Sequence, residues 1–560
     1  MGRGGSATTR PEPFRPPSCP RWFSAVLVAT LLPVGWAQVA AKPDGARGVF
    51  ADSLRAILGA DARGAHVGLL ALSLDRGDTL LALGESDRLI TGSNAKLFPM
   101  GALLRQQGPG ARRETIVEAR GKATRRGAEG AGASYAFHGD LVIHPTGMPD
   151  IVPLGSPGSR GLLDSLAFRL RVGGLGAFRG TLWLDRTLFA DEPPPPGWGD
   201  DDLAYGYGAV LGPVLANGNA VLVRAEEEGG RIRLSLDPPD VPLSVRDAGI
   251  TVGSPGGGGW LVPRWNRHRT AVLLRGVVPR GGTVLRNVAM ADPDSAAAVL
   301  FLASLRREGI EVGKVAIKFI PPGSGEGGVE SVAPGQGVPE PVAGAWNAVA
   351  TVAPWDSVDG GRYRVVGTLE SPTVEHAIAV VAAHSLNAES EGLLRLVGGS
   401  ERARTRHEGI QEIMKLADAT GIDTFDLSLV DGSGLSPFDL ASPRAVVRWL
   451  EALEADSLTR GALRAALPSP GKPGTLEHRF GAFPPGASLR AKTGSLTNVT
   501  ALSGYATTLE GETLVFSMLT NGARRTVSSM RDAEERLVAF LARVPRQRRA
   551  GVDPPGVPPR

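Results

Sequence analysis

The apolar positions near the start of the chain change from a helical to an alternating period. Residues 49–61 (VFADSLRAILGAD) place apolar side chains at helical spacing, whereas residues 66–84 (HVGLLALSLDRGDTLLALG) alternate on both sides of a polar turn. The first pattern predicts a helix and the second a β-hairpin. A further helix is predicted through TGSNAKLF at 91–98.

The middle of the chain is predicted to be mainly β. Short apolar runs broken by Gly and Pro lie at 141–147, 180–189, 220–236 and 270–285, and such runs are typical of strands joined by turns. One helical pattern, at 294–310, interrupts them.

The last third of the chain returns to helices and ends in a hairpin and a helix. Helical patterns at 375–399 and 442–456 precede hairpin-like strands at 487–521. The stripe of the final helix consists of Met530, Ala533, Leu537, Leu541 and Val544. A membrane surface is one partner for such a stripe, but a sheet is the commoner one and is expected here.

The first 41 residues have the layout of a secretory signal peptide. Arginines lead into WFSAVLVATLLPVGWAQVA (22–40), a short apolar core that ends in small residues, with cleavage expected near Ala37 to Ala41. A membrane anchor is the alternative, but Pro33 and Gly35 interrupt a run barely long enough to span a bilayer. The mature protein is therefore expected in the periplasm or otherwise outside the cytoplasm, with no transmembrane span.

Composition narrows the class of protein further. The chain has 560 residues, 42% of them hydrophobic and 21% charged, with a net charge of +4. This fits a globular protein of several domains, and no basic stripe points to nucleic acid. Cys19 is the only cysteine and precedes the apolar segment, so neither a disulfide nor a lipid anchor on that cysteine is expected.

Ser93 and Lys96 stand three residues apart at the start of a predicted helix. On a helix these positions share a face, so the amine can take the proton of the hydroxyl if burial or a nearby cation lowers its pKa. The other Ser-x-x-Lys, at 469–472, contains Pro470 and Gly471, which argue against a helix.

Two weaker motifs follow. Ser385 and Asn387 lie two residues apart at a predicted turn; they suit proton transfer and amide binding, although helix capping alone would explain them. Lys492, Thr493 and Gly494 begin a strand, where a lysine and a hydroxyl can bind a carboxylate and glycine admits a substrate backbone.

In this order the three motifs form the signature of penicillin-binding proteins and serine β-lactamases. Over about residues 48–545 the chain resembles the class C low-molecular-mass penicillin-binding proteins, the D-alanyl-D-alanine carboxypeptidase/endopeptidase family S13 typified by penicillin-binding protein 4. The blocks that carry the resemblance are RLITGSNAKL, SEGLL (390–394), DGSGLS (431–436), PGTLEHR (473–479) and AKTGSLTNVTALSGY (491–505), together with GWGDDDLAYGYGAVLGPVLANGNAV. Departures include Gly92 where Ala is usual, Pro99 inside the catalytic helix, and PFD after DGSGLS where Arg and Asn are usual.

The resemblance implies an α+β fold, in which a transpeptidase-like antiparallel sheet flanked by helices is split by a large, mainly β two-domain insertion. The implied catalytic domain covers 46–105 and 346–545, and the insertion covers 106–345. The insertion ends in a Gly/Pro-rich linker at 321–344, and a disordered tail is expected at 546–560.

The resemblance also implies an activity on peptidoglycan stem peptides through an acyl-enzyme, with β-lactam antibiotics as covalent inhibitors and no cofactor or metal. The implied catalytic residues are Ser93, Lys96 and Ser385, and the implied substrate-binding residues are Asn387, Lys492, Thr493, Gly494 and Ser495. The backbone N–H groups of Ser93 and Ser495 would form the oxyanion hole.

The loop GWGDDDLAYGYG (197–208) is a further candidate for substrate binding. Trp198, Asp201 and Tyr205 combine a carboxylate with flat apolar walls, which would suit a charged tip on the stem's diamino acid, although a solvated acidic turn is an equal alternative.

Other classes fit less well. A Ser-His-Asp hydrolase lacks the G-x-S-x-G elbow, and Asp200–Asp202 lack the His or Cys spacing of a metal enzyme. A β-lactamase of the same superfamily and a non-catalytic cell-wall-binding module remain as alternatives.

Overall fold

The computed structural model describes residues 47–545 except 48, 60, 61, 63, 127–132, 150–160, 323–352, 399–401, 482 and 523–526. The predicted signal peptide, the predicted tail and all but the first two residues of the predicted linker lie outside the described residues.

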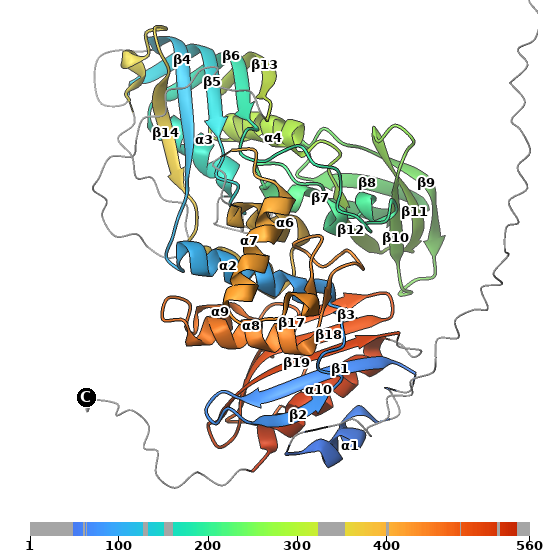
Figure 1. The fold of residues 1–560 in the computed structure, drawn as a ribbon. Coiled ribbons are helices and arrows are strands. Elements are labelled where there is room, and N and C mark those ends of the chain that lie inside the picture. The colour runs from blue at the N-terminus through green and yellow to red at the C-terminus, as the bar shows by residue number, and fades with distance from the viewer. Residues whose placement is uncertain are drawn as a thin grey trace, which may run out of the picture. The chain divides into compact units, whose positions relative to one another are not determined.

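The central element is a five-stranded antiparallel sheet built from both ends of the chain. Its order is β17 (Ser488–Leu496), β18 (Val499–Thr507), β19 (Thr513–Asn521), β1 (His66–Ser73) and β2 (Thr79–Leu83). The blue β1 and β2 lie beside the red C-terminal strands in Figure 1. The predicted hairpins at 66–84 and 487–521 are confirmed, and the pairing of β1 with β19 joins them into one sheet.

Helices cover both faces of this sheet because its apolar side chains alternate. Leu69 and Ala71 pack into the core that contains α10 (Val527–Arg543) and α1 (Leu54–Leu58), whereas Leu70 and Leu72 pack into the core on the opposite face. The stripe predicted on the final helix is buried, which confirms that it packs on the sheet.

The second core holds the remaining helices of this part. They are α2 (Leu97–Gln107), α5 (Val374–His384), α6 (Asn387–Val397), α7 (Arg406–Ala419), α8 (Pro443–Ala455) and α9 (Ala462–Ala466). A small sheet, made of β3 (Leu89–Ile90), β15 (Leu427–Ser428) and β16 (Leu440–Ala441), connects the segment before Ser93 to the C-terminal half.

The middle of the chain forms a five-stranded mixed sheet with two helices. Its order is β13 (Glu311–Ile320), β6 (Leu175–Asp185), β5 (Ser134–His144), β4 (Glu114–Arg126) and β14 (Arg364–Glu370). Helices α3 (Leu162–Val172) and α4 (Pro293–Arg307) share a core with it.

Two three-stranded sheets complete the middle segment. One contains β12 (Thr283–Ala289), β7 (Ala220–Glu228) and β8 (Arg231–Asp237). The other contains β10 (Trp260–Trp265), β11 (Ala271–Pro279) and β9 (Ser244–Gly253). The expectation of a mainly β insertion into an α+β fold agrees with this architecture.

The strand β14 follows the predicted domain boundary at residue 345 but does not belong to the sheet of the C-terminal part. β14 pairs antiparallel with β4, and so belongs by hydrogen bonding to the mixed sheet rather than to the C-terminal catalytic part. The buried residues of β14 are consecutive and do not alternate, so its sequence pattern does not reveal its partner, which long-range pairing decides. We therefore place the end of the insertion after Glu370.

Within the described part of the chain, no helix combines the length and the apolar character needed to cross a bilayer.

Candidate active site

Ser93 and Lys96 lie on one turn, in the 3₁₀ helix η3 (Gly92–Lys96) that leads directly into α2. Lys96 Nζ lies 3.0 Å from Ser93 Oγ. Ser93 is half-buried whereas Lys96 is completely buried. Pro99, one of the departures from the family pattern, is the third residue of α2 and is buried.

The Lys96 amine is held by two further acceptors. It donates to Asn387 Oδ1 at 2.7 Å and to the Ser433 carbonyl at 2.5 Å. Three acceptors account for all the donors of an ammonium group and fix the amine beside the hydroxyl.

Ser385 lies between α5 and α6 with a left-handed backbone (φ 56°). This is a strained conformation for a residue other than glycine. Lys492 Nζ donates to Ser385 Oγ at 2.9 Å and to the Thr493 carbonyl at 2.8 Å. Neither Ser385 nor Asn387 caps α6 with its side chain. Ser385 is the C-cap residue of α5, with its backbone N–H donating to the Val381 carbonyl, but this backbone cap does not account for the contact of its side chain with Lys492.

Asn387 connects Lys96 to the middle segment. Its Nδ2 donates to the Tyr207 carbonyl at 2.9 Å while its Oδ1 accepts from Lys96. Lys96 and Asn387 are 291 positions apart in sequence, so the fold alone brings them together.

Burial lowers the pKa of Lys96 from 10.5 to about 8, although nearby carboxylates oppose the shift. Burial, and then the charge of Lys96, hold the pKa of Lys492 well below its usual value. In the free protein nearby carboxylates favour the protonated form of Lys96. The repulsion between the two lysines therefore mainly lowers the pKa of Lys492.

The strand β17 carries the motif of Lys492, Thr493 and Gly494, and it ends at a cavity beside Ser93. Ser93, Ser385, Asn387 and Ser495 all line one cavity of about 560 Å³. Thr493 is half-buried and Gly494 is buried, with room beside Gly494 only for a hydrogen: a β-carbon there would lie 2.6 Å from the Thr91 carbonyl. The three sequence motifs therefore meet at one cavity.

The backbone conformation of Gly92 explains why glycine departs from the family pattern at this position. It has φ +49°, and a β-carbon would lie 3.1 Å from the Ser495 backbone N. Glycine adopts this left-handed conformation without strain, so it suits the position before Ser93.

The loop 197–208 reaches the pocket, but with other residues than expected. Asp202 and Tyr207 line the Ser93 cavity, and the Tyr207 hydroxyl donates to Asp202 Oδ1 at 2.8 Å. Asp201 is instead exposed and pairs with Arg264 at 3.1 Å, while Tyr205 stacks on Tyr207. Asp201 and Tyr205, predicted as pocket residues, are not among the residues that line the cavity, because Asp201 pairs with Arg264 and Tyr205 packs on Tyr207 instead.

Trp198, the third residue predicted for that pocket, has a supporting position. Its Nε1 donates to Asp431 Oδ2 at 2.8 Å. Asp431 also accepts from the backbone N–H groups of Ser433, Gly434 and Ser436 at 2.6–2.8 Å. Asp431 thus shapes the loop whose Ser433 carbonyl holds Lys96.

Several site residues had no role in the sequence prediction. They are Asp202, Tyr207, Asp431, Ser433, Leu435 and Pro437. The DGSGLS block (431–436) was the available signal for Asp431, Ser433 and Leu435, because an Asp followed by glycines is typical of a turn, and Pro437 follows that block directly. Among the described residues, no three His, Cys, Asp or Glu side chains are arranged to hold a metal ion.

An antiparallel sheet between helices, with Ser-x-x-Lys on the turn that enters a helix, defines the class of penicillin-recognising serine enzymes. Residues 51–325 and 360–544 match the D-Ala-D-Ala carboxypeptidase 3 (S13) family, and the chain belongs to that family. The expected class, a serine-type D-alanyl-D-alanine carboxypeptidase, is thereby confirmed.

Curated relatives agree. The chain is 27% identical over 539 residues to a D-alanyl-D-alanine carboxypeptidase of Actinomadura sp. (strain R39), covering 91% of this chain and 90% of the relative. It is 23% identical to the D-alanyl-D-alanine carboxypeptidase DacB of Haemophilus influenzae over 82% of this chain and 86% of that one.

The fold is also similar to a solved structure. Penicillin binding protein 4 (dacB) from Haemophilus influenzae matches with a TM-score of 0.64 at 22% identity, covering 88% of this chain and 99% of the other.

Proposed function

We propose that this protein cleaves the bond between the two terminal D-alanines of peptidoglycan stem peptides, with Ser93 as nucleophile. The observation that carries the proposal is the contact of Lys96 Nζ with Ser93 Oγ at 3.0 Å inside a cavity that also holds Ser385 and Asn387. A hydroxyl needs such a base to attack a carbonyl.

In this mechanism Lys96 in its neutral form takes the proton of Ser93 as the Oγ–C bond forms. The backbone N–H groups of Ser93 and Ser495 stabilise the oxyanion, at roughly 3 kcal/mol per donor. The proton returns through Ser385 to the nitrogen of the leaving D-alanine as the peptide bond breaks. Water then hydrolyses the ester and regenerates Ser93.

The low pKa of Lys492 gives substrate binding an electrostatic role. A terminal carboxylate bound by Lys492 and Thr493 raises the pKa of Lys492, because an opposite charge favours the ammonium form. The resulting charge on Lys492 in turn lowers the pKa of Lys96. Binding of the correct chain end therefore prepares the base.

Product analysis tests the proposal. Purified stem pentapeptide and cross-linked dimers are incubated with the protein, and the products are separated by chromatography. Release of D-alanine from the pentapeptide is expected, and cleavage of the dimers would add endopeptidase activity. Absence of cleavage, with no penicillin bound, would favour the non-catalytic wall-binding module.

Penicillin separates the carboxypeptidase from a β-lactamase. We expect acylation of Ser93 and release over hours, since among the described residues lining the cavity we assign none to rapid activation of the deacylating water. Rapid turnover of penicillin would instead support the β-lactamase alternative. The substrate lies in the cell wall, so we place the mature protein outside the cytoplasm.

The second-order rate constant of penicillin acylation is expected to rise with pH and to reach its midpoint near the Lys96 pKa of about 8, because this constant reports the free protein. The sign follows because only the neutral amine accepts a proton; well below the midpoint the rate should increase roughly tenfold per pH unit. The groups that face Lys96 are Asp431, Glu391, Glu389, Asp439 and Lys492. Stopped-flow acylation across this range measures the profile, and a pH-independent rate would contradict the assigned base.

Asp202→Asn is expected to raise KM for peptides whose diamino acid ends in a free amine by roughly 5- to 30-fold. Asp202 is the carboxylate that lines the Ser93 cavity, and the amide cannot pair with an ammonium. Peptides lacking the amine, and penicillin, should react almost normally. Asp201→Asn is the matched control, because the exposed Asp201 lies outside the cavity. An equal loss on all substrates would assign Asp202 a structural role.

A further inference from the structure

Ser495 lies at the end of the Ser93 cavity where the terminal carboxylate of a substrate would bind. It lines the cavity and stands two positions after Thr493 on β17, so the two hydroxyl-bearing side chains share one face of the strand. The proposed function assigns that carboxylate to Lys492 and Thr493. A group that acts on the Ser495 hydroxyl therefore acts beside the carboxylate.

The Ser495 hydroxyl is in contact with an arginine of the C-terminal helix. Arg531 of α10 is exposed, and its Nη2 donates to Ser495 Oγ at 3.0 Å. The two residues are 36 positions apart, and β17 is an edge strand of the central sheet, so the helix reaches the strand at that edge. None of the sequence motifs or catalytic steps above uses Arg531.

The turn of α10 that carries Arg531 is held in place by ion pairs. Arg479 pairs with Glu534 and with Glu535, each at 3.0 Å, and donates to the Arg531 backbone carbonyl at 3.2 Å. These two glutamates follow Arg531 at helical spacing, where they would otherwise be suited to pair with it. Among the described residues, no carboxylate forms an ion pair with Arg531. Its hydrogen bond to Ser495 therefore leaves its charge unpaired.

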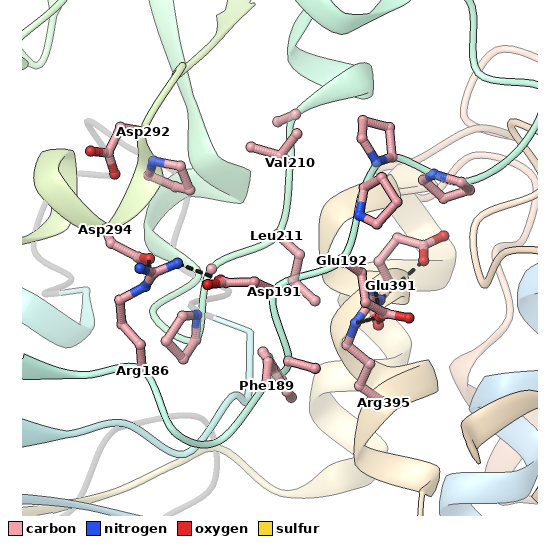
Figure 2. A pocket seen from close by; sticks show the side chains of 18 of the residues that line it. Arg186, Phe189, Asp191, Glu192, Val210, Leu211, Asp292, Asp294, Glu391 and Arg395 are labelled. Carbon is pink, nitrogen blue, oxygen red and sulfur yellow. Dashed lines mark hydrogen bonds and ion pairs between the residues drawn. The ribbon is translucent and has the colours of Figure 1, made fainter. Parts of the chain in front are cut away.

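The arginines of a second cavity, of about 470 Å³, provide a contrast. Figure 2 shows Arg186 paired with Asp191 and Arg395 paired with Glu192. A ligand carboxylate would have to displace these partners. At Arg531 there is no such competition, because Ser495 is uncharged.

The lining of the Ser93 cavity itself provides no cation. Of the described residues that line it, only Asp202 has a charged side chain, and that charge is negative. Lys492 reaches the lining through its bond to Ser385, but burial, and then the charge of Lys96, hold the pKa of Lys492 well below its usual value. A guanidinium carries a fixed charge, so Arg531 is positive before any substrate arrives.

We propose that Arg531 is a positioning residue for recognition of the substrate's terminal carboxylate, acting through Ser495. Because Ser495 Oγ accepts from Arg531, its own proton is directed away from the guanidinium and is available to the carboxylate. A hydroxyl that accepts from a cation is also a stronger donor. This role rests on the proposed function, since it concerns the D-alanine end of the stem peptide.

Arg531→Gln tests the role in stopped-flow acylation by penicillin and by its methyl ester, whose carboxyl group is neutral. We expect initial binding of penicillin to weaken roughly tenfold, while the acylation rate at saturation stays almost unchanged. The ester should react alike with the variant and the unchanged protein. Arg531→Lys should lose less binding, because it keeps the charge and a donor. An equal loss on both compounds, or no loss on penicillin, would refute the proposal.

Arg543→Gln is the matched control. Arg543 is another exposed arginine of α10, about 18 Å further along the helix, and donates to the Ala539 carbonyl. This variant should bind penicillin normally, and weakened binding would show that any lost charge on α10 has the same effect. Thermal melting followed by circular dichroism verifies the fold of each variant.

A double-mutant cycle with Ser495→Ala tests whether Arg531 acts through the hydroxyl. Ser495→Ala removes the hydroxyl and keeps the backbone N–H. In this background Arg531→Gln should weaken penicillin binding much less than it does in the unchanged protein. An undiminished effect would refute action through Ser495.

The unchanged protein separates this proposal from the proposed function. If it neither releases D-alanine from the pentapeptide nor reacts with penicillin, the proposed function fails and the role of Arg531 fails with it. If it reacts, and Arg531→Gln does not discriminate between penicillin and the ester, only the role of Arg531 is refuted.

Discussion

A Ser93→Ala variant is expected to lose all covalent labelling by a fluorescent penicillin while its thermal melting stays close to that of the unchanged protein. Ser93 is half-buried, and its side chain makes one hydrogen bond, to Lys96, so alanine removes the nucleophile with little structural loss. Gel fluorescence after incubation, with intact-protein mass spectrometry for the adduct, measures the result.

The chain contains a matched control for this experiment. Ser469 belongs to the other Ser-x-x-Lys, and it is also half-buried, but it lies outside the Ser93 cavity. Ser469→Ala should label normally. Labelling that persists in Ser93→Ala, or that disappears in Ser469→Ala instead, would move the nucleophile away from Ser93.

Replacing Lys96 by alanine is expected to slow acylation by roughly 10²- to 10⁴-fold while initial penicillin binding changes little. The amine contacts Ser93 Oγ at 3.0 Å and is fully buried, so proton transfer is its main contribution. Stopped-flow measurements over a range of penicillin concentrations separate the binding constant from the acylation rate. A loss confined to binding would contradict the role of base.

Lys96→Arg sharpens this test. Arginine keeps the positive charge but does not release its proton at accessible pH, so it cannot serve as base. The arginine variant should acylate as slowly as the alanine variant at every pH. Substantial rescue by arginine would show that Lys96 contributes charge rather than proton transfer. Circular dichroism melting of both variants checks that loss of the buried amine has not unfolded the protein.

The Ser93 site also shows how a short motif acquires a catalytic geometry. Ser-x-x-Lys places hydroxyl and amine on one turn, but the low pKa of Lys96 comes from burial beneath α6 and the 431–436 loop, which contribute Asn387 and the Ser433 carbonyl. The second Ser-x-x-Lys, at 469–472, has no such covering. The spacing of serine and lysine alone is therefore not sufficient to produce this geometry.

Loop 197–208 marks the limit of prediction from residue types. The sequence made this acidic aromatic loop a candidate for reading the substrate, with a solvated turn as an equal alternative, and the loop does reach the cavity. Among three consecutive aspartates the sequence analysis chose Asp201, whereas Asp202 lines the cavity. The exposed Asp201 pairs with Arg264, a residue of β10 that is distant in sequence, and the next residue, Asp202, faces the cavity.

The sequence by itself determined the local elements, the family and the identity of the three motifs, because these depend on residue type and short-range spacing. Only the tertiary structure decided that β14 joins the mixed sheet and that Asp202 and Tyr207 line the same cavity as Ser93. Each of these depends on contacts between residues far apart in the chain, whose pairing is set by burial and hydrogen bonding in the folded protein rather than by any local pattern.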